Sequence, residues 1–199
     1  MHQVSDIAAL EALYGPPAEA SLIKVTAYLT PEYRHWIGAS RFCVLSTIGP
    51  EGTDGSPRGD EGPVVRIADD RTLLLPDWRG NNRMDSLRNI VRDGRVSLLF
   101  LIAGSTTAMR VNGTAHLSVD PDLLAGFARN EGQPRTVIVI AITEVYSQCA
   151  RALIRAGLWG RDETAGLPTV GDMLRGVKAG FDGAEYDADW PGRAARTMW

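Results

Sequence analysis

Residues 71–94, RTLLLPDWRGNNRMDSLRNIVRDG, decide how this chain folds. The run RTLLLPDW predicts a β-strand, because adjacent apolar residues are followed by a proline and an aspartate that end them. Met84, Leu87, Ile90 and Val91 then fall on one face of a predicted helix, and Gly94 stands where a C-terminal cap belongs. The stretch therefore predicts a strand that passes through a polar, arginine-rich loop into a helix.

Five further β-rich runs flank this stretch, and they are RFCVLSTIG, SPRGDEGPVVRIA, RVSLLFLIAG, AMRVNGTAHLSV and TVIVIAITEVY. The first two are predicted to form an antiparallel meander with RTLLLPDW, since turn-forming residues separate them. Strands joined by hairpin turns, with few helices between them, favour a mainly β fold over a parallel α/β sheet. We expect a six-stranded antiparallel β-barrel with helical additions.

Three segments organise the chain. Residues 1–40 are predicted to be a helical N-terminal extension packed on the barrel, with one helix beginning at Thr30-Pro31, where proline suits the first helical position. Residues 41–160 are predicted to form the barrel. Residues 161–199 form a C-terminal extension with no assigned role and one expected helix, in VGDMLRGVKAG.

The composition of the 199 residues is that of a globular protein. Hydrophobic residues make up 44% and charged residues 23%, which excludes a mainly disordered chain. The net charge of -3 argues against a nucleic-acid partner. No apolar run is long enough to cross a bilayer and no secretory signal is visible, so a cytoplasmic protein without a membrane partner is expected. The three histidines have no metal-ligand spacing, so no metal site is predicted.

Two arginine-bearing segments are the candidates for chemistry. Arg58 lies between a proline and a glycine in SPRGD, where the backbone can approach a ligand closely. Asn82 and Ser86 lie at the predicted helix start with Arg83 between them, and helix N-termini bind phosphate readily. The residues alone leave open a second reading, in which Asn82 is an ordinary N-cap and the arginines are solvated.

The segments TIGPEGTDGSPRGD, LLLPDWRGNNRMDSLRNI, RVSLLF and RVNGTAHL, in this order, resemble the pyridoxamine 5'-phosphate oxidase-like family of FMN-binding split β-barrels. The resemblance runs from Arg41 to about Val119 and less strictly to Trp159. It implies a six-stranded split barrel of the FMN-binding type, which forms a homodimer with FMN at the subunit interface. The oxidase segment that holds pyridoxal phosphate has no equivalent here, which favours another flavin reaction.

The resemblance implies nine FMN-binding residues: Ser56, Arg58 and Gly59 on the strand that reaches the ribityl-phosphate, Leu75 and Pro76 at the strand end that lines the flavin ring, Asn82, Arg83 and Ser86 at the helix start that holds the phosphate, and Arg110 on the strand that approaches the partner subunit's flavin. No catalytic residue is assigned, because hydride chemistry resides in the flavin itself.

The function expected from the resemblance is that of an FMN-dependent oxidoreductase with an unidentified small-molecule substrate. Trp36, Trp78 and Trp159 are candidates for the wall of a pocket for a planar molecule. One alternative is a flavin-binding module that is not an enzyme. Another is a split barrel that uses deazaflavin F420 or haem, for which His116 would be the axial ligand.

Overall fold

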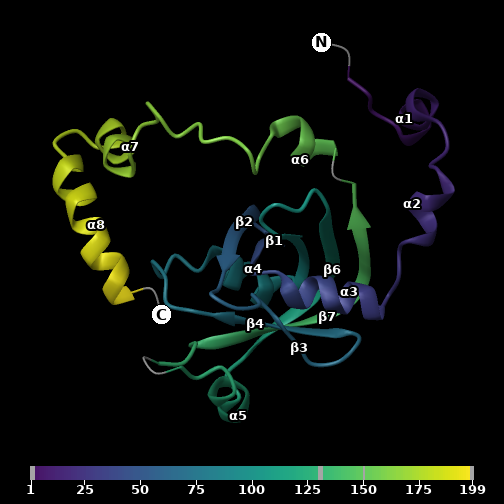
Figure 1. Cartoon of the computed structure of the whole chain (residues 1–199), viewed down its shortest axis with the longest axis horizontal. Coiled ribbons are helices and arrows are strands. Elements are labelled where there is room, and N and C mark those ends of the chain that lie inside the picture. The colour runs from purple at the N-terminus through teal and green to yellow at the C-terminus, as the bar shows by residue number, and fades with distance from the viewer. Residues whose placement is uncertain (1–2, 130–131, 150, 198–199) are drawn as a thin grey trace.

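The computed structural model describes residues 3–129, 132–149 and 151–197. Within these ranges the strands form one antiparallel sheet of seven, in the order β2-β1-β5-β6-β7-β4-β3. Its strands are β1 (Phe42–Gly49), β2 (Gly52–Gly59), β3 (Arg66–Ile67), β4 (Thr72–Asp77), β5 (Arg95–Leu101), β6 (Ala108–Ser118) and β7 (Thr136–Gln148). The prediction of a mainly antiparallel β fold with helical additions is confirmed (Figure 1).

Two details differ from the expected six-stranded barrel. The seventh strand is β3, a two-residue strand at the edge of the sheet beyond β4. The expected antiparallel pairs form, since β1 pairs with β2 and β3 with β4, but the run expected to be the middle strand is divided into β2 and β3 at opposite edges of the sheet. The long partner of β4 is β7, as in Leu75 opposite Ile138. Three consecutive leucines in β4 are buried, and pairing with the apolar β7 covers them better than the polar β2 would.

The core lies on the inward side of this sheet. Its largest fully buried side chains include Phe100, Leu45, Leu98, Leu73, Leu75, Ile138, Ile140 and Val111. The register of β6 against β7 shifts between Asn112 and Gly113. A Cβ at Gly113 would lie 2.2 Å from the Ala141 carbonyl oxygen, so the close approach at this bulge requires glycine.

The helices are α1 (Ile7–Tyr14), α2 (Glu19–Ile23), α3 (Pro31–Ala39), α4 (Asp85–Arg92), α5 (Pro121–Ala125), α6 (Arg151–Ala156), α7 (Val170–Val177) and α8 (Gly183–Thr197). The helix expected at Thr30-Pro31 is confirmed as α3, in which the Thr30 side chain accepts a hydrogen bond from the Tyr33 N–H at 3.2 Å. Ile37 of α3 is fully buried against the sheet. The 15-residue α8 was not expected, because its Gly, Asp and Ala-rich sequence has little helical periodicity.

The helices at the two ends of the chain stand away from the sheet, while Thr26 pairs with Val145 of β7 and Trp159 donates to the Ser105 carbonyl. Figure 1 shows α1 and α2 on one side of it and α7 and α8 on the other. We call residues 3–28 the N-terminal arm and residues 151–197 the C-terminal arm. Within the expected 1–40 extension, α3 therefore packs on the sheet, whereas α1 and α2 bury no residue. No helix in the described part of the chain has the length and apolar character needed to cross a membrane.

Candidate functional site

A cavity of about 1270 Å³ opens between β2, the end of β4 and the first turn of α4. Eight of the nine predicted flavin-binding residues line it, namely Ser56, Arg58, Gly59, Leu75, Pro76, Asn82, Arg83 and Ser86. They come from three segments that lie apart in the sequence, and the fold brings them to one place. A cavity of this size exceeds the roughly 300–1,000 Å³ typical of small-molecule sites, so it has room for a ligand of cofactor size.

An ion pair crosses the cavity between β2 and β4, which are not neighbours in the sheet. The Arg58 Nη1 lies 2.5 Å from the Asp77 Oδ1, and the two side chains are only 18% and 16% exposed. The Arg58 Nε is buried and has no hydrogen-bond partner within the described residues. A buried guanidinium N–H without an acceptor is unusual in a folded protein. It marks this position as one that can receive an acceptor from a ligand.

The loop that leaves β4 is held by a buried carboxylate. The Asp60 side chain is 3% exposed and accepts hydrogen bonds from the Trp78 Nε1 at 3.2 Å and the Arg129 Nη2 at 2.5 Å. The Arg129 guanidinium also lies 4.8 Å from the centre of the Trp78 ring. These contacts fix Trp78 as a wall of the cavity. Of the three candidate tryptophans, Trp36 instead packs against the core, and Trp159 donates to the Ser105 carbonyl.

The helix start differs from the prediction. The helix α4 begins at Asp85, and its N-cap is Met84, which has a left-handed backbone with φ 62° and makes no capping hydrogen bond through its side chain. Asn82, expected at the helix start, lies three residues earlier and is also left-handed, with φ 58°. Its Oδ1 accepts a hydrogen bond from the Arg135 Nη1 at 3.2 Å. Two left-handed residues turn the loop sharply, so the helix cannot begin sooner.

Arg83, predicted to hold the phosphate at the helix start, is highly accessible. Its side chain is 79% exposed, and its Nε lies 2.6 Å from the Asp85 Oδ2. Its backbone N–H donates to the Asn81 Oδ1 at 3.0 Å. The Arg83 side chain therefore keeps its terminal nitrogens available to an anion, next to the N-terminal end of α4.

The buried face of α4 is polar. The Ser86 hydroxyl donates to the Asp54 carboxylate of β2, and the Asn89 Nδ2 donates to the Thr47 Oγ1 of β1 at 3.1 Å. Both contacts fasten the helix to the β1–β2 hairpin. Since its proton is engaged by Asp54, the Ser86 hydroxyl supports the cavity wall and is not an uncommitted donor.

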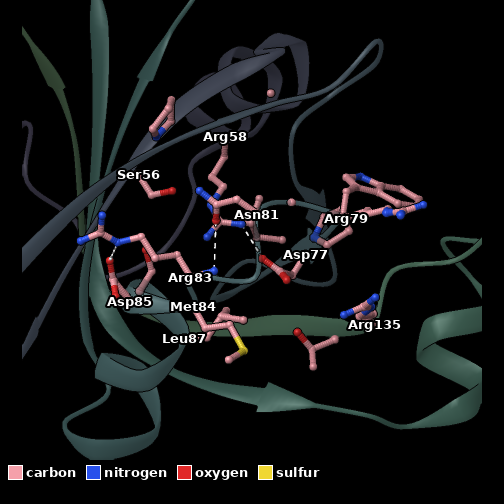
Figure 2. A pocket seen from close by; sticks show the side chains of 18 of the residues that line it. Ser56, Arg58, Asp77, Arg79, Asn81, Arg83, Met84, Asp85, Leu87 and Arg135 are labelled. Carbon is pink, nitrogen blue, oxygen red and sulfur yellow. Dashed lines mark hydrogen bonds and ion pairs between the residues drawn. The ribbon is translucent and has the colours of Figure 1, made fainter. Parts of the chain in front are cut away.

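Charges of both signs line the cavity. The carboxylates are Asp54, Asp60, Glu61, Asp77 and Asp85, and the guanidinium groups are Arg58, Arg79, Arg83 and Arg135. Figure 2 shows Arg58 and Arg83 on one side, with Arg79 and Arg135 on the other side of Asp77. Such a surface suits a polar ligand, and an anionic group would have to lie beside the guanidinium groups, because the carboxylates outnumber them. Within residues 3–129, 132–149 and 151–197, no cluster of three His, Cys, Asp or Glu is placed to hold a metal.

Arg110 is the one predicted residue that lies away from the cavity. It is on β6, where its Nη1 donates to the Tyr146 hydroxyl at 3.1 Å. Its assignment to the partner subunit's flavin stays a prediction. His116, further along β6, is exposed and does not line the cavity.

Four further residues of the site were not predicted, and they are Asp60, Asp77, Arg129 and Arg135. Asp60 directly follows β2 and Asp77 ends β4, and both strands carry residues predicted to bind the cofactor. Their positions at these strand ends could have indicated them. Arg129 and Arg135 reach the site from the α5–β7 connection, far along the chain, and no local pattern indicates them.

The two cysteines are not part of the site. Cys43 is buried in β1, and burial raises the pKa of its thiol to about 12, so it stays protonated at neutral pH. Cys149 is exposed.

Comparison with known proteins places the chain in a family. The model of the pyridoxamine 5'-phosphate oxidase family matches residues 29–149. The chain belongs to the pyridoxamine 5'-phosphate oxidase family. The match covers the whole sheet together with α3, α4 and α5, and both arms lie outside it. No relative was found among curated proteins.

Several solved structures are similar to this family member. HupZ from Group A Streptococcus is 17% identical with a TM-score of 0.50, and the likeness covers 61% of this chain and 94% of that one. A pyridoxamine 5'-phosphate oxidase candidate from Lactobacillus delbrueckii is 25% identical with a TM-score of 0.49, over 61% of this chain and 95% of that one. An FMN-binding protein from Syntrophomonas wolfei is 13% identical with a TM-score of 0.42, over 57% and 86%. The first of these likenesses bears on the fold alone.

Proposed function

We propose that this protein is an FMN-dependent oxidoreductase of the pyridoxamine 5'-phosphate oxidase family, acting on a small molecule in the cytoplasm. The proposed state is a homodimer, with the six longer strands forming a split barrel and FMN at the subunit interface. Family membership supports a flavin cofactor. The observation that carries the proposal is the unpartnered, buried Arg58 Nε in a cavity of cofactor size that also holds Arg83.

The residues of the cavity fit FMN in type. The phosphate, a dianion near neutral pH, would be held by the Arg83 terminal nitrogens and by the N–H groups in the first turn of α4. The Arg58 Nε would donate to the ribityl chain or the phosphate, which gives this buried group the acceptor that it lacks. The end of β4, at Leu75 and Pro76, is buried and apolar, and it would line the isoalloxazine ring.

In the proposed reaction the protein holds FMN, orients it and shields it from water. FMN, when bound, supplies the hydride chemistry. Asp77 fixes the Arg58 guanidinium, and Asp60 fixes Trp78, so two walls of the cavity are set before any ligand arrives. Arg110 would close the site from the partner subunit. No side chain of this chain is assigned as an acid or a base.

The absorption spectrum of the purified protein tests the proposal. Flavin bands, release of FMN on denaturation, and quenching of FMN fluorescence on titration of the stripped protein are the expected results. Reduction of the bound flavin by NADH or NADPH would distinguish an enzyme from a flavin-binding module without activity. A colourless protein that leaves added FMN fluorescence unchanged would refute the proposal, and a Soret band would favour haem with His116.

A further inference from the structure

The two arms contain helices that have no core of their own. In the described residues of both arms, the only buried positions are Gly171 and Gly183, which have no side chain. Helices of this length are marginal in water unless an apolar face is packed against something. Two of these helices nonetheless have complete N-terminal caps. Asp6 caps α1, and Thr169 and Asp172 form a capping box at the start of α7.

The exposed apolar side chains of the chain are concentrated on these arms. Among the described residues, 21 large hydrophobic side chains are exposed. All of them lie in the two arms except Phe42, Met84, Val91 and Val119. On α7, Val177 is 88% exposed. Scattered exposed apolar residues are ordinary, but a concentration of this kind marks an interaction surface.

The total surface supports the same conclusion quantitatively. The chain exposes 13270 Å². A compact monomer of 21.6 kDa exposes about 9,200 Å². The excess is about 4,000 Å² per copy, or about 8,000 Å² for two copies, which is more than the roughly 2,000–5,000 Å² that both partners of an obligate homodimer bury in total. The arms thus hold enough uncovered surface for a permanent interface.

A receiving surface is present on the sheet. In β1 and β5 the side chains alternate, and at one end of the outward face the paired positions carry Phe42 beside Leu101 and Val44 beside Leu99, with Phe42 37% exposed. The other end of this face is polar and carries Ser46, Ser97 and Arg95. The helix α4 covers the opposite face of β1, where Asn89 bonds Thr47. The end of the outward face that holds Phe42 and Leu101 is apolar and only partly covered, so it can take an apolar helix.

We propose that the two arms clasp a second copy of this chain, by packing their apolar faces on the outward face of its β1 and β5. A second copy fits because it supplies both halves of the contact at once, the arms and the sheet face, as a two-fold interface requires. The arms lie on either side of the sheet, as Figure 1 shows, so they can hold a partner from two directions. This inference rests on the homodimer of the proposed function and is independent of its flavin.

Charge placed on the arms tests the inference in the full chain. Val177→Glu in α7 and Leu13→Glu in α1, which is 68% exposed, change positions that bury nothing within one copy, so each copy should fold as before by circular dichroism. Val119→Glu is the matched control, since Val119 is also 68% exposed but follows β6, outside the arms. Sedimentation velocity from nanomolar to micromolar concentration should show a dimeric parent and control. Each arm variant should raise the dissociation constant of the dimer at least tenfold.

A photo-crosslinker at position 177 tests which surface receives the C-terminal arm. Copies labelled with ¹⁴N and ¹⁵N are mixed, exchanged and irradiated, and peptides that join the two isotopes report contacts between copies. The expected mixed-isotope peptides join the arm to residues 42–48 or 95–101. A monomeric parent, arm variants that dimerise like the parent, or crosslinks confined to one copy or to another surface would each overturn the inference. An FMN titration of the parent is run separately, and its failure would refute the proposed function without affecting these results.

Discussion

Replacement of Arg83 by alanine should separate FMN from riboflavin, which differ only by the phosphate. The Arg83 terminal nitrogens are available to a phosphate beside the α4 N-terminus, while its Nε remains on Asp85. A charge-assisted hydrogen bond contributes roughly 1.5–3 kcal/mol, and the 79% exposure of this side chain places Arg83 at the lower end. Since each 1.4 kcal/mol is a factor of about ten, Arg83→Ala should weaken FMN about tenfold. Riboflavin binding should change less than about twofold.

Arg58→Ala provides the contrast. Arg58 is largely buried, and its loss leaves the Asp77 carboxylate, 16% exposed, without its partner. Loss of one member of a buried pair costs roughly 3–5 kcal/mol when burial is complete, and somewhat less here. This variant should therefore be less stable and should bind both ligands more weakly, with a smaller ratio between them than Arg83→Ala shows.

Fluorescence-quenching titrations of both variants with both ligands measure these ratios. Arg88→Ala is the control, because Arg88 is an exposed arginine of α4 that does not line the cavity. The Arg83 effect should shrink in 1 M salt, since exposed charges are screened. If Arg83→Ala binds FMN like the parent, or loses riboflavin to the same extent, the phosphate does not lie at this helix start and the reasoning is wrong.

Three further predictions concern the scaffold. Gly171→Ala should separate α7 from α8, because the added Cβ would lie 2.1 Å from a backbone oxygen of α8, and hydrogen exchange in α7 should then become faster. Gly176→Ala is the control, since open space surrounds Gly176, and it should not accelerate this exchange. Asn89→Ala should destabilise the fold by about 1–3 kcal/mol in urea unfolding, because the buried Thr47 hydroxyl loses its donor, and an unchanged midpoint would contradict this. The pKa of Cys43, raised by burial from 9.0 to about 12, means that the folded state holds this proton more tightly. The contribution of this thiol to the free energy of unfolding is then retained below pH 9 and lost as the pH rises toward 12, by up to roughly 1.4 kcal/mol per pH unit. In a Cys43→Ala variant the free energy of unfolding should depend less on pH over this range.

Local signals in the sequence predicted local structure well. The Thr30-Pro31 start of α3 was predictable because both the cap and the fixed proline φ act within a few residues. The arginine of SPRGD was identified by its place in the strand. The polar loop after β4 was also expected, but Asn82 and Met84 both have positive φ, and although asparagine is frequent there, methionine is not. The helix start was therefore placed too early.

Long-range features were beyond the reach of local patterns. The pairing of β4 with β7 joins residues about sixty positions apart, and adjacency along the chain suggested a different neighbour. The Asp77 partner of Arg58 and the contact of Arg129 with Asp60 follow from that pairing. The helix α8 was missed because its apolar residues do not repeat with a helical period.

The partnership of β4 with β7 also sets an order of events during synthesis. The β1–β2 hairpin is local and can form as soon as its residues leave the ribosome, whereas β4 has no long partner until residues 136–141 have been made. Until then Leu73, Leu74 and Leu75 lie on a strand whose β7 edge is unpaired. Exposed apolar strands of this kind aggregate between nascent chains or are bound by chaperones. The ligand cavity is thus one of the last parts of the molecule to exist. A chain truncated before β7 would carry most of the predicted cofactor contacts and still have no pocket to hold a cofactor.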